Sequence, residues 1–257
     1  MNAALHYRHR YYSPAYAARV DIDGTPLLDD LARRYLPSGA CVLDVGAGAG
    51  GRKHPCREPG IRLVGIDPSP LVTSNPDLDC CVCHPAEEMP FESGSFDLVF
   101  SDFTLEHLPN PEAVISEIHR VLKPGGHLVF RTVNAYHYVA MIARFTPAGL
   151  RDRFLELATR SEAFPTFYRL NTRKKIKRLL QHNGFKLESA IMVEGPPDYL
   201  AFSPVLYSLG LMYERIANSS RYFDFMKSNL IMAAAKDVDA PALGEPDVRE
   251  SGPAVCV

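Results

Sequence analysis

The residues best suited to chemistry lie in a glycine-rich stretch that begins with an acid. Asp44 is followed by glycines at alternate positions, Gly46, Gly48 and Gly50. Glycine adopts positive φ and has no Cβ, so a ligand can contact the backbone there. A second acid, Asp67, comes 23 positions later (67 − 44 = 23), about one βαβ step, where a carboxylate can bind both hydroxyls of a ribose. The pattern predicts a nucleoside-binding site.

This glycine-rich stretch is open to more than one interpretation. A dinucleotide-binding loop needs the spacing G-x-G-x-x-G and a helix directly after it. Here Pro55 and Pro59 interrupt the segment that follows, and proline breaks a helix interior, so the first crossover should be short or irregular. A glycine loop that only closes a turn is the structural alternative. Arg52 in this segment should face solvent, with contact to a bound carboxylate as the alternative.

The elements that must position these residues follow from apolar runs and helical patterns. Short apolar runs predict strands, and apolar residues every three or four positions predict helices. Their alternation is typical of an α/β fold. The predicted strands are residues 41–45, 61–67, 96–101, 127–133, 185–193 and 229–236, with Cys80, Cys81 and Cys83 read as buried strand cysteines; the predicted helices are 29–35, 111–122 and 172–183.

Further stretches carry a family resemblance. Residues 85–101 are similar to the pattern D-A-E-x-L-P-F, a turn and F-D-x-V, and residues 103–111 are similar to x-L-E-H-L-x-D-P. Val121–Gly126 matches a turn into a strand, and Gly184-Phe185 matches an x-G-F strand entry. From about residue 40 to 135, with a weaker match beyond, the chain resembles the class I S-adenosylmethionine (SAM) methyltransferases, in the small-molecule branch that includes ubiquinone- and menaquinone-methylating enzymes.

The resemblance implies an enzyme with SAM as cofactor and S-adenosylhomocysteine (SAH) as product. It implies a seven-stranded, mostly parallel Rossmann-like sheet with helices on both faces and a partly helical cap from two inserts. In this family the glycine loop passes under the methionine part of SAM, and the acid before it helps to hold the amino group. The cofactor-binding residues so implied are Asp44, Gly46, Ala47, Gly48, Asp67, Pro68, Ala86, Glu87, Ser101 and Phe103.

One departure from the family pattern concerns the adenine pocket. The family commonly has an acid at the position of Pro85, and its side chain takes the adenine amino group. Proline cannot do so. Glu87 or a backbone carbonyl must replace it, or adenine is held mainly by packing, while the amide of Ala86 can still bond the ring.

The domain organisation expected from the sequence has three parts. Residues 1–40 form an N-terminal lid, or alternatively a helix that only packs on the core. Residues 41–236 form the methyltransferase domain, whose aromatic-rich inserts 134–171 and 196–226 form the acceptor pocket, because ligands in such folds bind outside the carboxyl ends of the strands. Residues 237–257, rich in Pro, Gly, Ala and acids, form a disordered tail.

Two histidines are candidate general bases. His107 lies in the motif after the fourth predicted strand, and His137 follows the tip of the fifth; the alternatives are a helix-capping His107 and an exposed His137. A hydroxyl acceptor needs a base, whereas a carboxylate is already ionised at neutral pH. Arginines could pair with an acceptor carboxylate. The candidate acceptor-binding residues are Tyr12, Tyr16, Asn134, Arg144, Tyr168, Arg169 and Tyr199.

These observations favour methyl transfer to a small organic acceptor, on the oxygen of a carboxylate or hydroxyl. The segment Ser101–Thr104 lacks an N-P-P-Y-like motif, which argues against nitrogen as the acceptor atom. The alternatives are C-methylation of a quinone-like or polyketide-like acceptor, a non-catalytic SAM-binding or regulatory protein, and an NAD-dependent oxidoreductase. The last would need a catalytic pair that cannot be placed.

Composition narrows the remaining function classes. The chain has 257 residues and a formal net charge of −2, so no overall field attracts nucleic acid or anionic lipid. Its six cysteines lack a disulfide or metal-site spacing. We expect no metal, no nucleic-acid partner, no membrane span, a cytoplasmic location, and a monomer or homodimer.

Overall fold

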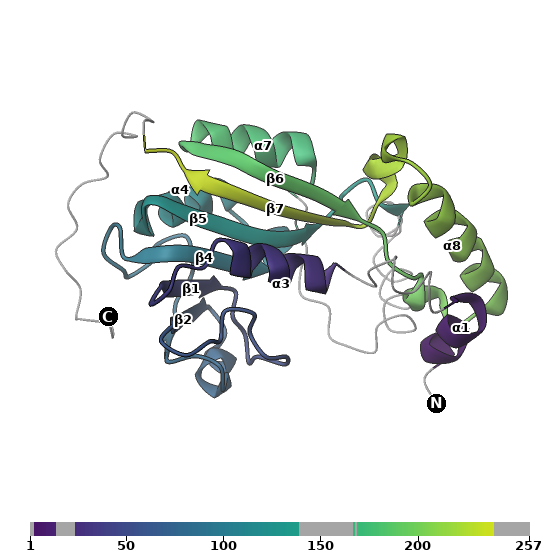
Figure 1. The fold of residues 1–257 in the computed structure, drawn as a ribbon, viewed down its shortest axis with the longest axis horizontal. Coiled ribbons are helices and arrows are strands. Elements are labelled where there is room, and N and C mark those ends of the chain that lie inside the picture. The colour runs from purple at the N-terminus through teal and green to yellow at the C-terminus, as the bar shows by residue number, and fades with distance from the viewer. Residues whose placement is uncertain (1–2, 14–23, 139–166, 168, 239–257) are drawn as a thin grey trace. The chain divides into compact units, whose positions relative to one another are not determined.

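The computed structural model describes residues 3–13, 24–138, 167 and 169–238 (Figure 1). Its seven-stranded sheet has the order β3-β2-β1-β4-β5-β7-β6. The strands are β1 (Cys41–Val45), β2 (Arg62–Asp67), β3 (Cys80–Cys83), β4 (Phe96–Asp102), β5 (Leu122–Val133), β6 (Phe185–Val193) and β7 (Asn229–Lys236). The pairs β1–β2, β1–β4, β2–β3 and β4–β5 are parallel. The predicted mostly parallel, seven-stranded α/β sheet is confirmed.

The chain divides into two compact units. The sheet unit comprises residues 28–132, 167–190 and 231–257, and the helical unit comprises residues 1–27, 133–166 and 191–230. The helices of the sheet unit are α3 (Thr25–Arg34, from Leu28 on), α4 (Pro111–Val121) and α7 (Arg173–His182), and those of the helical unit are α1 (Ala3–Tyr11) and α8 (Pro204–Ala217). Short 3₁₀ helices are η1 (Pro70–Ser74), η2 (Leu105–His107), η3 (Asp198–Leu200) and η4 (Arg221–Met226).

Local sequence explains where these helices begin. Pro111 occupies the first turn of α4, and the side chain of Asn110 accepts a hydrogen bond from the Ala113 amide at 3.3 Å. Proline is tolerated at that position because the first amides of a helix have no intrahelical partner. Thr172 caps α7 in the same way. Pro204, which interrupts the apolar run in the sequence, is likewise the first residue of α8.

The predicted strands of the sheet core are buried as a parallel sheet requires. Val42, Leu43 and Val45 of β1 are all buried, because helices or loops cover both faces of such a sheet. The prediction of buried strand cysteines is wrong in part. Cys80 and Cys81 do lie on β3 but are half-buried, and Cys83 is exposed, since β3 is the edge strand.

The irregular first crossover is confirmed. Among the described residues, no helix lies between β1 and β2. The backbone amide of His54 instead donates to the Asp77 carboxylate at 2.7 Å, and the Arg57 side chain pairs with Asp79 at 2.6 Å. Side chains of the next connection therefore hold this loop in place of a helix.

Candidate functional site

The sheet order creates a switch point at the carboxyl ends of β1 and β4. The chain runs outward from β1 to β2 and β3 and then returns to β4 on the other side of β1. Asp44 lies opposite Gly65 of β2 and Phe100 of β4. In open α/β sheets ligands bind at this position. The sheet therefore brings together the ends of the three strands that carry Asp44, Asp67 and Asp102.

The glycine loop is held tightly against β4 at its first glycine. Gly46 has φ +80°, and a Cβ at this position would lie 2.1 Å from Oγ1 of Thr104. The hydroxyls of Ser101 and Thr104 both donate to the carbonyl of Val45, at 3.0 and 3.2 Å. Gly48, with φ +49°, differs because a Cβ there would meet no protein atom within 4 Å. Gly46 serves close packing, and Gly48 faces open space.

Asp67 connects the glycine loop to the end of β2. Its two carboxylate oxygens accept the amides of Gly48 at 3.0 Å and of Ser69 at 2.8 Å. An ionised carboxylate has about four acceptor positions, so these bonds leave acceptor capacity for the two hydroxyls of a ribose. The predicted role of Asp67 thus fits its geometry.

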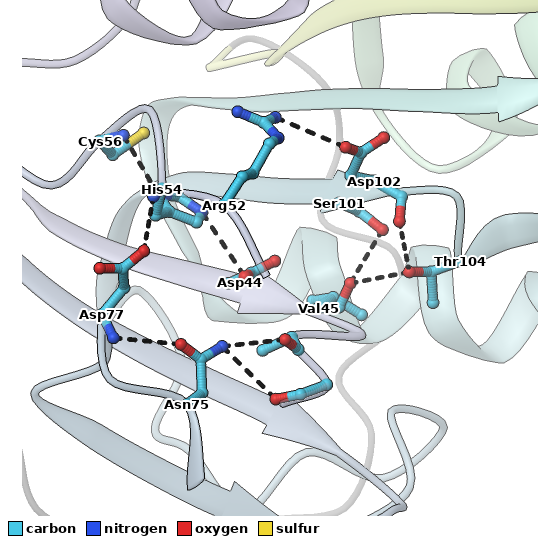
Figure 2. A network of polar contacts seen from close by, with 12 residues as sticks. Asp44, Val45, Arg52, His54, Cys56, Asn75, Asp77, Ser101, Asp102 and Thr104 are labelled. Atoms are coloured by element: carbon cyan, nitrogen blue, oxygen red, sulfur yellow. Dashed lines mark hydrogen bonds and ion pairs between the residues drawn. The ribbon is translucent and has the colours of Figure 1, made fainter. Parts of the chain in front are cut away.

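Asp44 is buried beside a histidine that the sequence analysis did not select. Its carboxylate oxygen lies 3.5 Å from Nε2 of His54 (Figure 2). Burial, with the neighbouring carboxylates of Asp102 and Asp67, raises the pKa of Asp44 to about 8. A bound cation beside Asp44 would lower its pKa again, because an opposite charge favours the ionised carboxylate.

His54 is held in one tautomer by its own loop. Its Nδ1 accepts the amide of Cys56 at 3.1 Å, so the neutral ring carries its proton on Nε2, the atom that faces Asp44. Within the described part of the chain this buried Nε2 has no hydrogen-bond partner. Burial, with nearby Arg52, lowers the pKa of His54 to about 4. The histidine is therefore a neutral donor. In the sequence, Pro55 indicates that no helix forms here, and this was the available signal that neighbouring His54 lies in a loop near the site.

Two arginines contact Asp102, the third carboxylate. Arg131 binds Asp102 with two hydrogen bonds, at 2.7 and 2.8 Å. Arg52 is exposed, as expected, and its guanidinium lies 3.5 Å from Asp102 (Figure 2) and 3.0 Å from Asp29.

Phe103, a predicted cofactor residue, has an unusual backbone. Its φ is +52°, and it is the one described non-glycine residue with positive φ. Its amide donates to the carbonyl of Arg131 at 3.0 Å, and the Arg131 guanidinium lies 4.2 Å from its ring centroid. Such strain is found most often at functional sites. Ser101, by contrast, is fully buried and uses its hydroxyl on β1.

The predicted adenine segment is fixed from α4. Ala86 is buried and Glu87 is half-buried. Glu117 accepts the amide of Met89 at 2.7 Å, and Arg120 donates to the carbonyls of Met89 and Phe91 at 2.9 and 2.7 Å. Glu117 and Arg120 were missed by sequence reasoning, because their i, i+3 spacing is typical of any surface ion pair.

The described residues fit SAM. Three carboxylates and an unpartnered buried N–H surround the loop, and Gly48 leaves open space beside it. The ammonium of SAM suits Asp44, its carboxylate suits the Nε2–H of His54 and the guanidinium of Arg52, and its ribose suits Asp67. The donors and acceptors thus match both ends of the cofactor.

The two candidate bases lie in different units. His107 is half-buried at the end of η2, in the sheet unit. It does not cap α4, because Asn110 does so. His137 lies in the helical unit and is not exposed, which corrects that alternative: it is buried, and its Nε2 lies 3.2 Å from Glu194. Next to His107, burial raises the pKa of Glu106, which accepts a hydrogen bond from Thr132 at 2.8 Å.

Most of the described candidate acceptor-binding residues are hydrogen-bonded to other protein groups. The buried Asn134 amide donates to the carbonyls of Phe225 and Lys227, both at 2.8 Å. Tyr12 donates to Glu214 at 3.2 Å, and Tyr199 donates to Tyr138. Arg169 is exposed, with its guanidinium over the Phe167 ring. These side chains have structural partners, which the sequence alone did not indicate. Tyr16, Arg144 and Tyr168 lie outside the described residues.

Comparison with known proteins agrees with this geometry. Residues 6–190 match the family described as "Methyltransferase domain". The chain belongs to this family. Its family and fold are those of the class I SAM-dependent methyltransferases, and SAM is the cofactor of that family. The expected recognition and cofactor are confirmed.

Two curated methyltransferases are similar over part of the chain. A ubiquinone biosynthesis O-methyltransferase of Pseudomonas paraeruginosa is 34% identical over 135 residues, which cover 45% of this chain and 57% of that protein. A demethylmenaquinone methyltransferase of Renibacterium salmoninarum is 33% identical over 146 residues, covering 51% and 56%. The matched region spans little more than half the length of these relatives.

Solved structures share the fold at low sequence identity. The [4+2]-cyclase SpnF has a TM-score of 0.55 and 22% identity, with 85% of this chain and 86% of that chain covered. A SAM-dependent methyltransferase from Mesorhizobium loti has a TM-score of 0.55 and 21% identity, with 82% and 97% covered. The described residues contain neither a helix able to cross a membrane nor a cluster of three or more His, Cys, Asp or Glu side chains suited to a metal ion.

Proposed function

We propose that this protein transfers a methyl group from SAM to a small organic acceptor, most simply to the oxygen of a carboxylate or hydroxyl. When bound, SAM would supply a methyl group activated by its sulfonium: an acceptor oxygen would bond to the methyl carbon as the carbon–sulfur bond breaks in line and SAH leaves. The observation that carries the proposal is the set of three carboxylates at the ends of β1, β2 and β4 around an open glycine loop. The curated relatives, both methyltransferases by name, support it.

The chain's own residues would divide the work of binding. Asp44 holds an ammonium, and His54 and Arg52 hold a carboxylate beside it. Asp67 fixes the loop through Gly48 and binds ribose hydroxyls with its remaining lone pairs. Most of the catalytic effect of such a site is alignment and exclusion of water. For a hydroxyl acceptor we propose His107 as the base, because His137 is buried against Glu194.

A matched pair of glycine variants tests the binding site. Gly48 and Gly94 have φ values of +49° and +68°, and a Cβ at either position meets no protein atom within 4 Å. Replacing either by alanine carries a similar backbone cost, of the order of 1 kcal/mol. We expect Gly48→Ala to weaken SAH binding at least about tenfold in calorimetry, because its methyl group enters the cofactor space. Gly94→Ala should bind SAH normally; equal affinities would contradict the proposed site.

A screen with isotope-labelled SAM then tests methyl transfer. Phenols, hydroxy acids and mono- and dicarboxylic acids are the acceptor classes to compare, and transfer of label to oxygen supports the proposal. The second candidate function is a SAM-binding protein without methyl transfer. It is favoured by the shared fold with a protein named as a [4+2]-cyclase. SAH binding without transfer to any class would select that candidate, and label on carbon would select C-methylation.

A further inference from the structure

Helix α8 is apolar on opposite faces. Its inner face is buried and includes Tyr207, Leu211 and Ala217. A Cβ on Gly210 would lie 2.5 Å from Cβ of Pro197, so the chain before η3 rests closely on this face. The opposite face is exposed yet equally apolar. A helix that is apolar all round requires a cover on both sides.

The exposed face of α8 forms a continuous stripe, which we name the apolar seam. On the helix it consists of Val205, Leu209, Met212 and Ile216, which are 69%, 53%, 57% and 42% exposed, and Phe202, which precedes the helix and is 44% exposed, extends it. Successive members are three or four positions apart. At about 100° per residue the four helical members fall within roughly 60° of one another around the helix. Single exposed apolar residues are common, but a contiguous stripe of this kind marks an interaction surface.

The exposed charged side chains of α8 and α1, near the apolar seam, are basic. The single acid of α8, Glu214, is fully buried and accepts a hydrogen bond from Tyr12. The exposed charged side chain of the helix is Arg215, which donates to the carbonyl of Tyr11 at 3.2 Å. Helix α1, which stacks Tyr7 on Tyr207, contains no acid in its sequence, and its Arg10 is exposed. The surroundings of the seam are therefore basic.

The neighbouring η4 adds exposed aromatic side chains. Tyr222 and Phe225 are 90% and 61% exposed, and Arg221 beside them is exposed. The acid of this segment, Asp224, is half-buried and paired with Lys227 at 2.7 Å. Aromatic residues combined with cations are typical of segments that lie at a membrane–water interface.

We propose that the apolar seam, with Arg215, Arg10 and Arg221 around it, binds the surface of an anionic lipid bilayer. The 14 residues of α8 would span about 21 Å, less than the roughly 30 Å hydrocarbon core, so α8 lies along the surface. A second copy of this chain fits the charges less well. Pairing two seams would bring like charges together, since neither α1 nor α8 offers an exposed acid.

A single introduced tryptophan reports the location of the seam. The chain has no tryptophan, so Leu209→Trp in the full protein gives an unambiguous fluorescence signal. We expect its emission to shift to shorter wavelength with vesicles of phosphatidylcholine and phosphatidylglycerol, and much less with phosphatidylcholine alone. Val238→Trp, at a 70% exposed position in the sheet unit, is the control and should not shift. An unshifted Leu209→Trp spectrum would overturn the proposal.

Vesicle sedimentation tests the two contributions separately. The double variant Leu209→Glu/Met212→Glu should lose at least about tenfold in vesicle partitioning, and Val238→Glu should not. Arg215→Gln should lose about fivefold on anionic vesicles only. SAH binding confirms that the variants remain folded, and it does not depend on the seam. Binding by the double variant equal to wild type overturns the proposal. So does a dimer, seen without vesicles, that the double variant dissociates, because the cover would then be a second copy.

Discussion

Among the residues that the structure describes, two buried histidines face a carboxylate, and they differ in what surrounds them. In the helical unit, Nε2 of His137 lies 3.2 Å from Glu194, whose other oxygen accepts the Ser228 amide at 2.6 Å. In the sheet unit, Nε2 of His54 lies 3.5 Å from Asp44 and, among the described residues, has no hydrogen-bond partner. The first pair is internally satisfied and the second is not. We propose from this difference that the first pair supports the fold and the second binds a ligand.

The largest expected effect is on the satisfied pair. Glu194→Ala should lower the free energy of unfolding by about 3–5 kcal/mol, because it removes one partner of a buried pair and leaves His137 buried. Urea unfolding of the full chain measures this. Glu188→Ala is the matched control, because Glu188 faces His127 at 3.3 Å but is 31% exposed, and it should cost at most about 1 kcal/mol. Similar losses for both variants would remove the distinction between a supporting and an exposed pair.

For the Asp44–His54 pair, substitution should instead change ligand affinity more than stability. Asp44→Asn removes a buried acid that is costly to ionise, so the stability of the cofactor-free protein at neutral pH should change little or rise. SAH affinity should fall by about 1.5–3 kcal/mol, the cost of losing a hydrogen bond to a charged group. Calorimetry and thermal melting on one preparation separate the two. A strongly destabilised Asp44→Asn protein with normal affinity would mean that this pair too is structural.

A smaller effect should appear in the pH dependence of cofactor-free stability. The pKa of Asp44 is raised from 3.8 to about 8, so its contribution is full at low pH and is lost as pH rises towards 8. The pKa of His54 is lowered from 6.5 to about 4, so its contribution is full above 6.5 and is lost as pH falls towards 4. The two slopes oppose one another below pH 6.5. Only Asp44 acts above it, where stability should fall by about 2 kcal/mol between pH 6.5 and 8.

Single variants should separate the opposing contributions of Asp44 and His54 to the pH dependence of stability. Asp44→Asn should leave only the histidine contribution, so stability would rise from pH 4 to 6.5 and then level off. His54→Gln should leave only the carboxylate contribution, so stability would fall from pH 4 to 8. Denaturant titrations in steps of half a pH unit measure both profiles. Profiles that all coincide would show that neither group has the assigned protonation behaviour.

The sequence predicts the sheet better than it predicts the partners of polar side chains. Strands 41–45, 185–193 and 229–236 are found with the predicted bounds, because strand burial depends on local apolar runs. The position of Asp67 at the end of its strand is also local information, and its role with ribose stays a prediction. His54 could not be selected, because its importance depends on Asp44 across the loop and on an amide that fixes its tautomer.

In the helical unit, residues that the sequence singles out have partners that it does not indicate. Asn134 and His137 were chosen for chemistry by residue type and position after a strand. Their partners, Phe225, Lys227 and Glu194, come from segments distant in the sequence. A residue type alone does not distinguish a side chain that binds a ligand from one that is already satisfied. That distinction needs the count of donors and acceptors that only the folded structure supplies.

The smallest effect tests whether that count also holds for Tyr199. Its hydroxyl donates to Tyr138, and burial raises the pKa of Tyr199 well above its usual value, so it stays protonated at neutral pH. Tyr199→Phe should lower stability by about 1 kcal/mol, the net value of one hydrogen bond, and leave SAH affinity unchanged. Tyr213→Phe, which removes a hydroxyl bonded to the Met226 carbonyl, should behave alike. If Tyr199→Phe instead raises the KM for an acceptor without a stability loss, its hydroxyl binds that acceptor, and the helical unit is then more than internal support.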